Sequence, residues 1–123
     1  MRARLIAICL LMLTDGGANA QIPAKPSPMK CETGPASRRF GGANWSIYSC
    51  DDKRSMVVVT SEGNPAAPFY FLLTPKAGGY AVNGEGTGDK RASDAAGDDI
   101  SRLTPTELAN LLAATKTVQR KPR

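Results

Sequence analysis

SMVVVTSEGNPAAPFYFLL, residues 55–73, is the stretch of the chain that decides its fold. It begins with a β-branched run at 55–61 and ends with an aromatic and aliphatic run at 69–73. Side chains of both kinds fit a pleated, half-buried surface, so each run is predicted to be a strand. Pro65 and Pro68 exclude regular structure between the two runs. Because this connection is too short for a crossover, the strands are predicted to be antiparallel.

Two further strands are predicted on either side of this pair. Residues 44–50 (NWSIYSC) precede it and are separated from it by a polar turn at 51–54. A short run at 80–82 follows a turn at 75–79. Three glycines are predicted to end this last strand: Gly84, Gly86 and Gly88. The pattern predicts an antiparallel β-meander of three to four strands.

The rest of the chain has helical signals. Thr104–Glu107 is a capping box with proline at the first helical position, and the leucines that follow repeat at helical spacing. They predict a helix over 105–117, and a weaker pattern predicts a second helix over 89–96, ending near Gly97. The fold class is therefore a small α+β domain: a β-meander of three to four strands followed by one or two C-terminal helices packed on one face.

The first twenty residues have the pattern of an export signal. A basic start at Met1–Arg4 precedes a nine-residue apolar run, LIAICLLML, and Ala18–Ala20 matches the small-x-small cleavage motif. Nine residues span about 14 Å as a helix, less than the roughly 30 Å of a bilayer core. The sequence therefore predicts signal cleavage after Ala20, no membrane span, and an exported protein that is periplasmic or secreted.

The expected domain organisation follows from composition. The signal peptide at 1–20 is followed by a proline-rich linker at 21–30, a single α+β domain at 31–118 and a basic tail at 119–123. The formal net charge is +5, but the basic residues are scattered and do not form a stripe interleaved with aromatics. Nucleic acid is therefore an unlikely partner, and a monomer or weak dimer is expected.

Two cysteines, Cys31 and Cys50, remain once Cys9 leaves with the signal. An even number of cysteines in an oxidising compartment predicts a disulfide. Their wide spacing differs from the Cys-x-x-Cys of redox-active pairs, so the bond is predicted to be structural. Closing a loop of about 20 residues stabilises a fold by roughly 3 kcal/mol in the chain-entropy model.

Catalytic and metal motifs are missing from the sequence. The chain contains no histidine, which excludes Ser-His-Asp and Cys-His catalysis and the usual histidine-containing zinc sites. No cofactor and no metal site are predicted. The alternative of a small enzyme would have to use carboxylates, and its candidates are Asp51, Asp52, Glu62 and Glu85. A structural envelope component is the third hypothesis.

The first candidate binding segment is residues 34–43, inside the predicted disulfide loop. Arg38, Arg39 and Phe40 lie there between glycines. Arginine and aromatic side chains are common among the residues that dominate interfaces, so this loop is the first choice for contact with a partner protein or envelope component. The alternative interpretation is a solvated loop whose Phe40 side chain folds back onto the core.

The second candidate is the glycine-rich run GEGTGDK at 84–90. It has the spacing of neither a P-loop nor a dinucleotide-binding fingerprint. Its backbone amides at Gly86, Thr87 and Gly88 are the candidate contacts for an anionic ligand, and the alternative is a flexible strand-to-helix turn. The nearby aspartates do not match a calcium loop. Asn44–Ser46 is a formal glycosylation sequon.

Tyr48–Lys53, followed by the apolar strand at 56–59, resembles the periplasmic inhibitors of C-type lysozyme. Members of that family carry a Ser-Gly-x-x-Tyr loop that enters the lysozyme cleft. The nearest match here, Ala77–Tyr80, lacks the serine and has a different spacing. The predicted C-terminal helix is also foreign to that small all-β barrel. The resemblance covers a short part of the chain and carries no functional residue over.

The export signal makes a direct prediction about the mature protein. Protein recovered from the exported fraction should begin at Gln21, because signal peptidase cleaves after the small-x-small motif. Intact-mass measurement without reduction checks this start. A mass that retains residues 1–20, or a start displaced by more than a few residues, contradicts the cleavage site.

Overall fold

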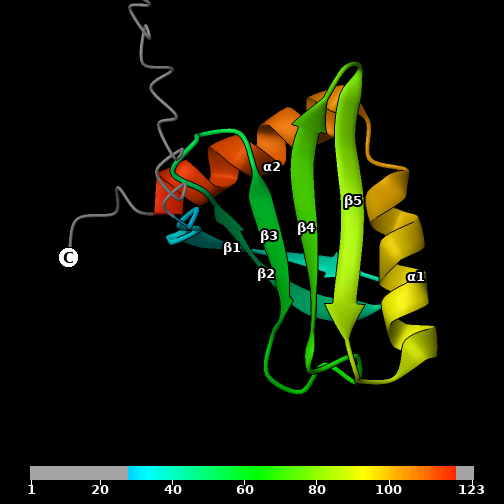
Figure 1. Cartoon of the computed structure of the whole chain (residues 1–123). Coiled ribbons are helices and arrows are strands. Elements are labelled where there is room, and N and C mark those ends of the chain that lie inside the picture. Colours follow the sequence, from blue (N-terminus) through cyan, green and yellow to red (C-terminus); the bar gives the residue numbers. More distant parts are fainter. Residues whose placement is uncertain (1–27, 119–123) are drawn as a thin grey trace, which may run out of the picture.

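Five strands lie in the sheet in the order in which they occur in the chain (Figure 1). The computed structural model of the protein describes residues 28–118. The strands are β1 (Thr33–Phe40), β2 (Ala43–Ser49), β3 (Met56–Thr60), β4 (Phe69–Lys76) and β5 (Gly79–Gly86), and each pairs antiparallel with the next. The helices α1 (Lys90–Ser101) and α2 (Pro105–Val118) follow. The α+β class and the antiparallel meander are confirmed.

The prediction of three to four strands is wrong, because residues 33–40 form β1 and not a loop. A tight turn joins β1 to β2 through Gly41 and Gly42, whose φ angles are 60° and 78°. Glycine adopts this left-handed conformation at no steric cost. Ala36 and Phe40 are the only buried residues of β1. The short arginine-containing run between them hides the alternation that would identify a strand.

Two elements continue past the glycines at which the sequence predicts their ends. The last strand runs to Gly86 and does not end at Gly84. Helix α1 continues through Gly97 to Ser101, although the sequence predicts its end near Gly97. In both cases packing overrides the weak propensity of glycine for regular structure, because an aromatic ring occupies the space of the missing side chain.

Helix α2 agrees with its prediction. Its capping box forms as expected: the Glu107 amide donates to the Thr104 hydroxyl (3.1 Å), and the Thr104 amide donates to the Glu107 carboxylate (3.2 Å). These two hydrogen bonds satisfy donors that the first helical turn leaves unpaired.

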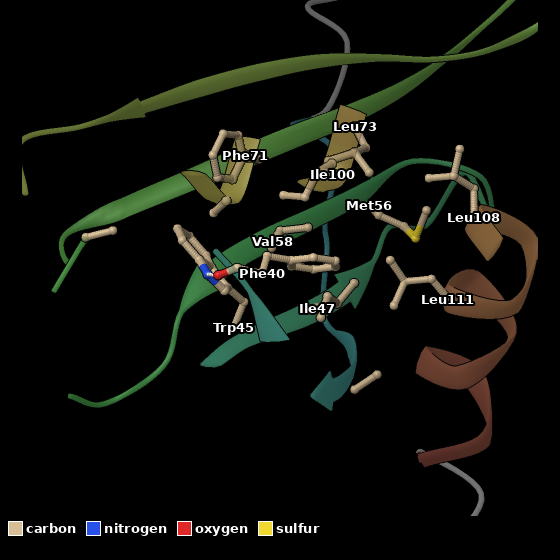
Figure 2. Close-up of a cluster of buried hydrophobic side chains, with 13 residues drawn as sticks. Phe40, Trp45, Ile47, Met56, Val58, Phe71, Leu73, Ile100, Leu108 and Leu111 are labelled. Atoms are coloured by element: carbon tan, nitrogen blue, oxygen red, sulfur yellow. Dashed lines mark hydrogen bonds between the residues drawn. The ribbon is translucent and has the colours of Figure 1, made fainter. Parts of the chain in front are cut away.

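One buried cluster joins the sheet to both helices (Figure 2). The sheet contributes Trp45, Ile47, Met56, Val58 and Leu73, each with no exposed surface. The helices contribute Ile100, Leu108 and Leu111, which point into the same layer. Both helices therefore cover the same face of the sheet.

The sheet is strongly twisted, and α1 contacts both of its edge strands, β1 and β5. The Gly41 amide, at the end of β1, donates to the Asp99 carboxylate of α1 (2.6 Å). Helix α2 packs on β1 and β2. As a result α1 lies beside β5 and leaves a groove between them.

The disulfide between Cys31 and Cys50 is present, with an S–S distance of 2.02 Å. It joins the two ends of the β1–β2 hairpin and so ties the first edge strand to the sheet. Within residues 28–118 no helix is long and apolar enough to cross a bilayer. The predicted signal at 1–20, most of the linker and the basic tail at 119–123 lie outside the described residues.

Replacing Leu111 with alanine is expected to lower the free energy of unfolding by about 2–5 kcal/mol. The Leu111 side chain is 4% exposed and packs α2 into the core. Urea unfolding of the two proteins measures the change. Leu112→Ala is the control, with a smaller expected effect because this neighbour is only partly buried. Equal losses in the two variants would show that α2 does not depend on the buried face.

Candidate functional site

A groove of about 850 Å³ lies between the end of the sheet and α1. We call it the β5–α1 groove. Its sheet side includes Phe69, Phe71, Val82, Gly84 and Gly86, and its helix side includes Lys90, Asp94, Asp98 and Ser101. The volume falls in the range of roughly 300–1,000 Å³ that is typical of ligand sites.

A second hollow of about 390 Å³ continues the groove towards the α1–α2 junction. The two share Val82 and Ser101, so they form one track along β5. The lining of the second hollow combines polar surface with the apolar side chains of Ile100 and Leu103. The track therefore runs along nearly the whole length of the last strand.

Two aromatic rings make the floor of the groove. The centroids of Phe69 and Phe71 are 4.9 Å apart, and a Cβ atom on Gly84 would lie within 3 Å of both rings. A Cβ on Gly97 of α1 would lie 3.3 Å from the Phe71 ring. The rings thus occupy the places that side chains of β5 and α1 would fill. Phe71 is buried, whereas Phe69 is partly exposed in the groove.

The helix side of the groove carries charge. Lys90 and Asp94 form an exposed ion pair (3.0 Å), which contributes little to stability because water screens it. Within residues 28–118, the Asp98 carboxylate forms neither a side-chain hydrogen bond nor an ion pair. The helix side therefore has one acidic charge in excess, although the formal net charge of the whole chain is +5.

The segment at 86–88 is engaged in packing. The Thr87 amide donates to the Pro68 carbonyl (3.0 Å), and the Asp89 amide donates to the Pro65 carbonyl (3.1 Å). The Asp89 carboxylate caps α1 by accepting from the Arg91 amide (2.8 Å). Gly88 abuts the Ala66 carbonyl so closely that a Cβ atom would overlap it. These contacts favour the structural interpretation of this segment over an anion site at its amides.

The structure places Arg38, Arg39 and Phe40 at the end of β1, beside the turn to β2. Phe40 is 6% exposed and belongs to the core, as the alternative interpretation predicts, so its side chain is not available as an interface anchor. Arg38 lies in a hollow beside Leu103 and Leu111 of the helical half. Arg39 lies on the opposite side of the strand and donates to the Asn44 side chain (3.3 Å). The three residues nevertheless line one hollow of about 390 Å³, in which Phe40 is buried and the two arginines are exposed.

The carboxylates proposed for catalysis lie on three separate segments of the chain. Asp51 and Asp52 are in the turn before β3, Glu62 is in the loop after β3, and Glu85 is on β5. Glu85 accepts a hydrogen bond from the Tyr70 hydroxyl (2.8 Å), which raises the pKa of that hydroxyl. Within residues 28–118 no three acidic or cysteine side chains gather in an arrangement that would hold a metal ion.

Asp52 has a structural role in its turn. Its carboxylate accepts hydrogen bonds from the Ser55 hydroxyl (2.6 Å), the Ser55 amide (2.8 Å) and the Arg54 amide (2.9 Å). Burial acts to raise the pKa of Asp52, but these hydrogen bonds and the Arg54 charge outweigh it and hold the pKa below its ordinary value.

Sequence reasoning missed the β5–α1 groove. A signal for it is present in the spacing: Val82, Gly84 and Gly86 alternate along one face of a strand that follows the aromatic run at 69–71. Comparison of the chain with protein-family models, curated proteins and solved structures gives no match. The function is therefore argued from the geometry of the groove.

Replacing Asp52 with alanine is expected to make stability less sensitive to acid. The pKa of Asp52 is lower in the folded protein, so its contribution is present above the unfolded pKa and is lost as the pH falls through the folded pKa. Thermal unfolding from neutral pH to about pH 3 should show the wild type and the variant converging. Asp51→Ala removes an exposed neighbouring carboxylate as a control. A stability difference that is constant over this pH range contradicts the assignment.

Proposed function

We propose that this protein is a small exported, non-catalytic binding protein that receives its partner in the β5–α1 groove. The partner is a protein or another envelope component. The observation that carries the proposal is the aromatic floor of the groove, where Phe69 keeps part of its ring exposed between a sheet and a helix. Partly exposed aromatic surface in a hollow of this size is typical of binding sites.

The chemistry around the groove supports binding over catalysis. The chain lacks histidine, and its cysteines at 31 and 50 are joined in a disulfide. Asp94 is paired with Lys90, and the carboxylates considered for acid-base chemistry lie on three separate segments of the chain. General acid-base catalysis needs a titratable group held within hydrogen-bond reach of the reacting atoms, and these carboxylates do not gather at one centre. The disulfide and the signal pattern support an exported location.

The test is capture of partners from an extract of envelope and secreted proteins with the mature protein as bait. Ser101→Trp places a large side chain in the middle of the track, since Ser101 lines both hollows. This variant should lose the captured partner while its thermal unfolding stays close to that of the wild type.

Ala109→Trp is the matched control. It adds the same side chain at an exposed helical position that does not line the groove, so capture should be unchanged. Retention of the partner by Ser101→Trp would place binding elsewhere, and the hollow beside Arg38 would then be the first surface to examine.

A further inference from the structure

We propose that the partner enters the β5–α1 groove as an extended polypeptide segment that pairs with β5 and becomes a sixth strand of the sheet. This inference rests on the proposed function, because it names the ligand of the same groove. It follows from the backbone of β5, from the contrast between the two sheet edges and from the charge of α1.

The backbone groups of β5 that face the groove follow from the register. The Thr87 amide bonds to the Pro68 carbonyl, and Phe69 pairs with Gly86 in the next position. Hydrogen-bonded and non-hydrogen-bonded pairs alternate in an antiparallel ladder, so 81, 83 and 85 face β4. The N–H and C=O groups of four residues therefore face the free edge: Tyr80, Val82, Gly84 and Gly86.

All four of these residues alternate with the ladder residues and lie on the groove side of the strand. Tyr80 and Val82 line the second hollow, and Val82, Gly84 and Gly86 line the main groove. Within residues 28–118, β5 pairs with β4 alone. A polypeptide backbone is the ligand that matches a row of alternating donors and acceptors at strand spacing.

The two edges of the sheet differ in protection. The opposite edge strand, β1, carries the devices that prevent strand addition: Pro35, a register irregularity between Thr33 and Ala36, and the charges of Arg38 and Arg39. β5 has no proline, no basic residue and no register irregularity. Its sole charged residue, Glu85, hydrogen-bonds to Tyr70 on the neighbouring strand. The edge that lacks proline, basic residues and a register irregularity is the one that opens into a groove.

The dimensions suit a short extended segment. Residues 80–86 span about 20 Å as a strand, and the α1 residues that line the groove, from Lys90 to Ser101, span about 16 Å. Helix α1 lies beside the free edge of β5 (Figure 1), so an isolated strand can enter more easily than the sheet of a second folded copy, which carries its own α1. The proposed ligand of the groove is therefore an extended segment of another protein.

The groove also predicts the side chains of that segment. An apolar side chain facing inward would cover the partly exposed Phe69 ring and Val82. A lysine or arginine facing α1 would pair with Asp98, whose carboxylate has no partner within residues 28–118. Charge complementarity therefore favours a segment whose groove-facing residues, at every second position, include both apolar and basic side chains.

The test selects binders to the mature protein from a displayed library of cysteine-free decapeptides. The selected peptides should carry apolar and basic residues at every second position, on the face that is turned to the groove. Val82→Pro removes an N–H that faces the free edge and leaves the hydrogen bonds to β4 intact, as proline is tolerated on an edge strand. It should weaken binding by at least about tenfold, because a peptide carbonyl loses its donor. Val82→Thr keeps the N–H and the β-branched shape, so its loss of binding should be much smaller than that of Val82→Pro.

Amide hydrogen exchange provides the second readout. Peptide binding should slow exchange at residues 80, 82, 84 and 86 and leave 81, 83 and 85 nearly unchanged, since these are already bonded to β4. Failure to select any peptide, or equal binding to wild type and Val82→Pro, overturns strand addition. Peptides lost on Ser101→Trp but kept by Val82→Pro would overturn strand addition and still support the groove as a binding site. Self-association that Val82→Pro abolishes would overturn the proposal in favour of a second copy of this chain.

Discussion

The packing of the Phe71 ring is the interaction on which the rest of the structure depends. The ring lies between Gly84 of β5 and Gly97 of α1, and its centroid is 5.4 Å from that of the buried Trp45 of β2. One side chain therefore holds the centre of the sheet, its last strand and the first helix at a fixed separation. Interiors are packed as densely as organic crystals, so a ring of this size leaves little freedom to the elements around it.

The same packing creates the groove. Glycine at positions 84 and 97 brings the backbones of β5 and α1 close to the ring, and β5 has no side chain of its own at Gly84 to fill the space beside it. Phe69 then covers the rest of the floor from the same strand as Phe71. The core and the candidate site are two sides of one aromatic cluster.

The other half of the fold is held by one hydrogen bond across the β1–β2 turn and one between distant parts of the chain. The Trp45 indole donates to the Phe40 carbonyl (3.0 Å), and the Thr115 hydroxyl donates to the buried Ser49 hydroxyl (2.7 Å). Together with the disulfide, they bind β1 and α2 to β2. Buried polar groups that find partners in this way cost little and specify one arrangement of the elements.

Local sequence signals predicted an element correctly where interactions between residues close in sequence determine its structure. The start of α2 depends on hydrogen bonds within Thr104–Glu107, and the runs at 55–61 and 69–73 contain side chains that suit strands in most contexts. The disulfide was predictable from cysteine number and compartment, since two cysteines allow a single pairing. In contrast, the strand at 33–40 was missed because its pairing is with β2 and its local pattern is weak.

What the sequence by itself determined is therefore the class of the fold, the C-terminal helix, the structural disulfide and the lack of histidine-based chemistry. Only the tertiary structure decided that Phe40 belongs to the core, that α1 continues through Gly97 and that β5 borders a groove. The physical reason is distance along the chain. Gly84 is required because aromatic rings occupy the space of a side chain at that position. The rings are those of Phe69 and Phe71, which belong to a different strand. No local pattern contains that contact, so the candidate site becomes visible only when the sheet and the helices are assembled.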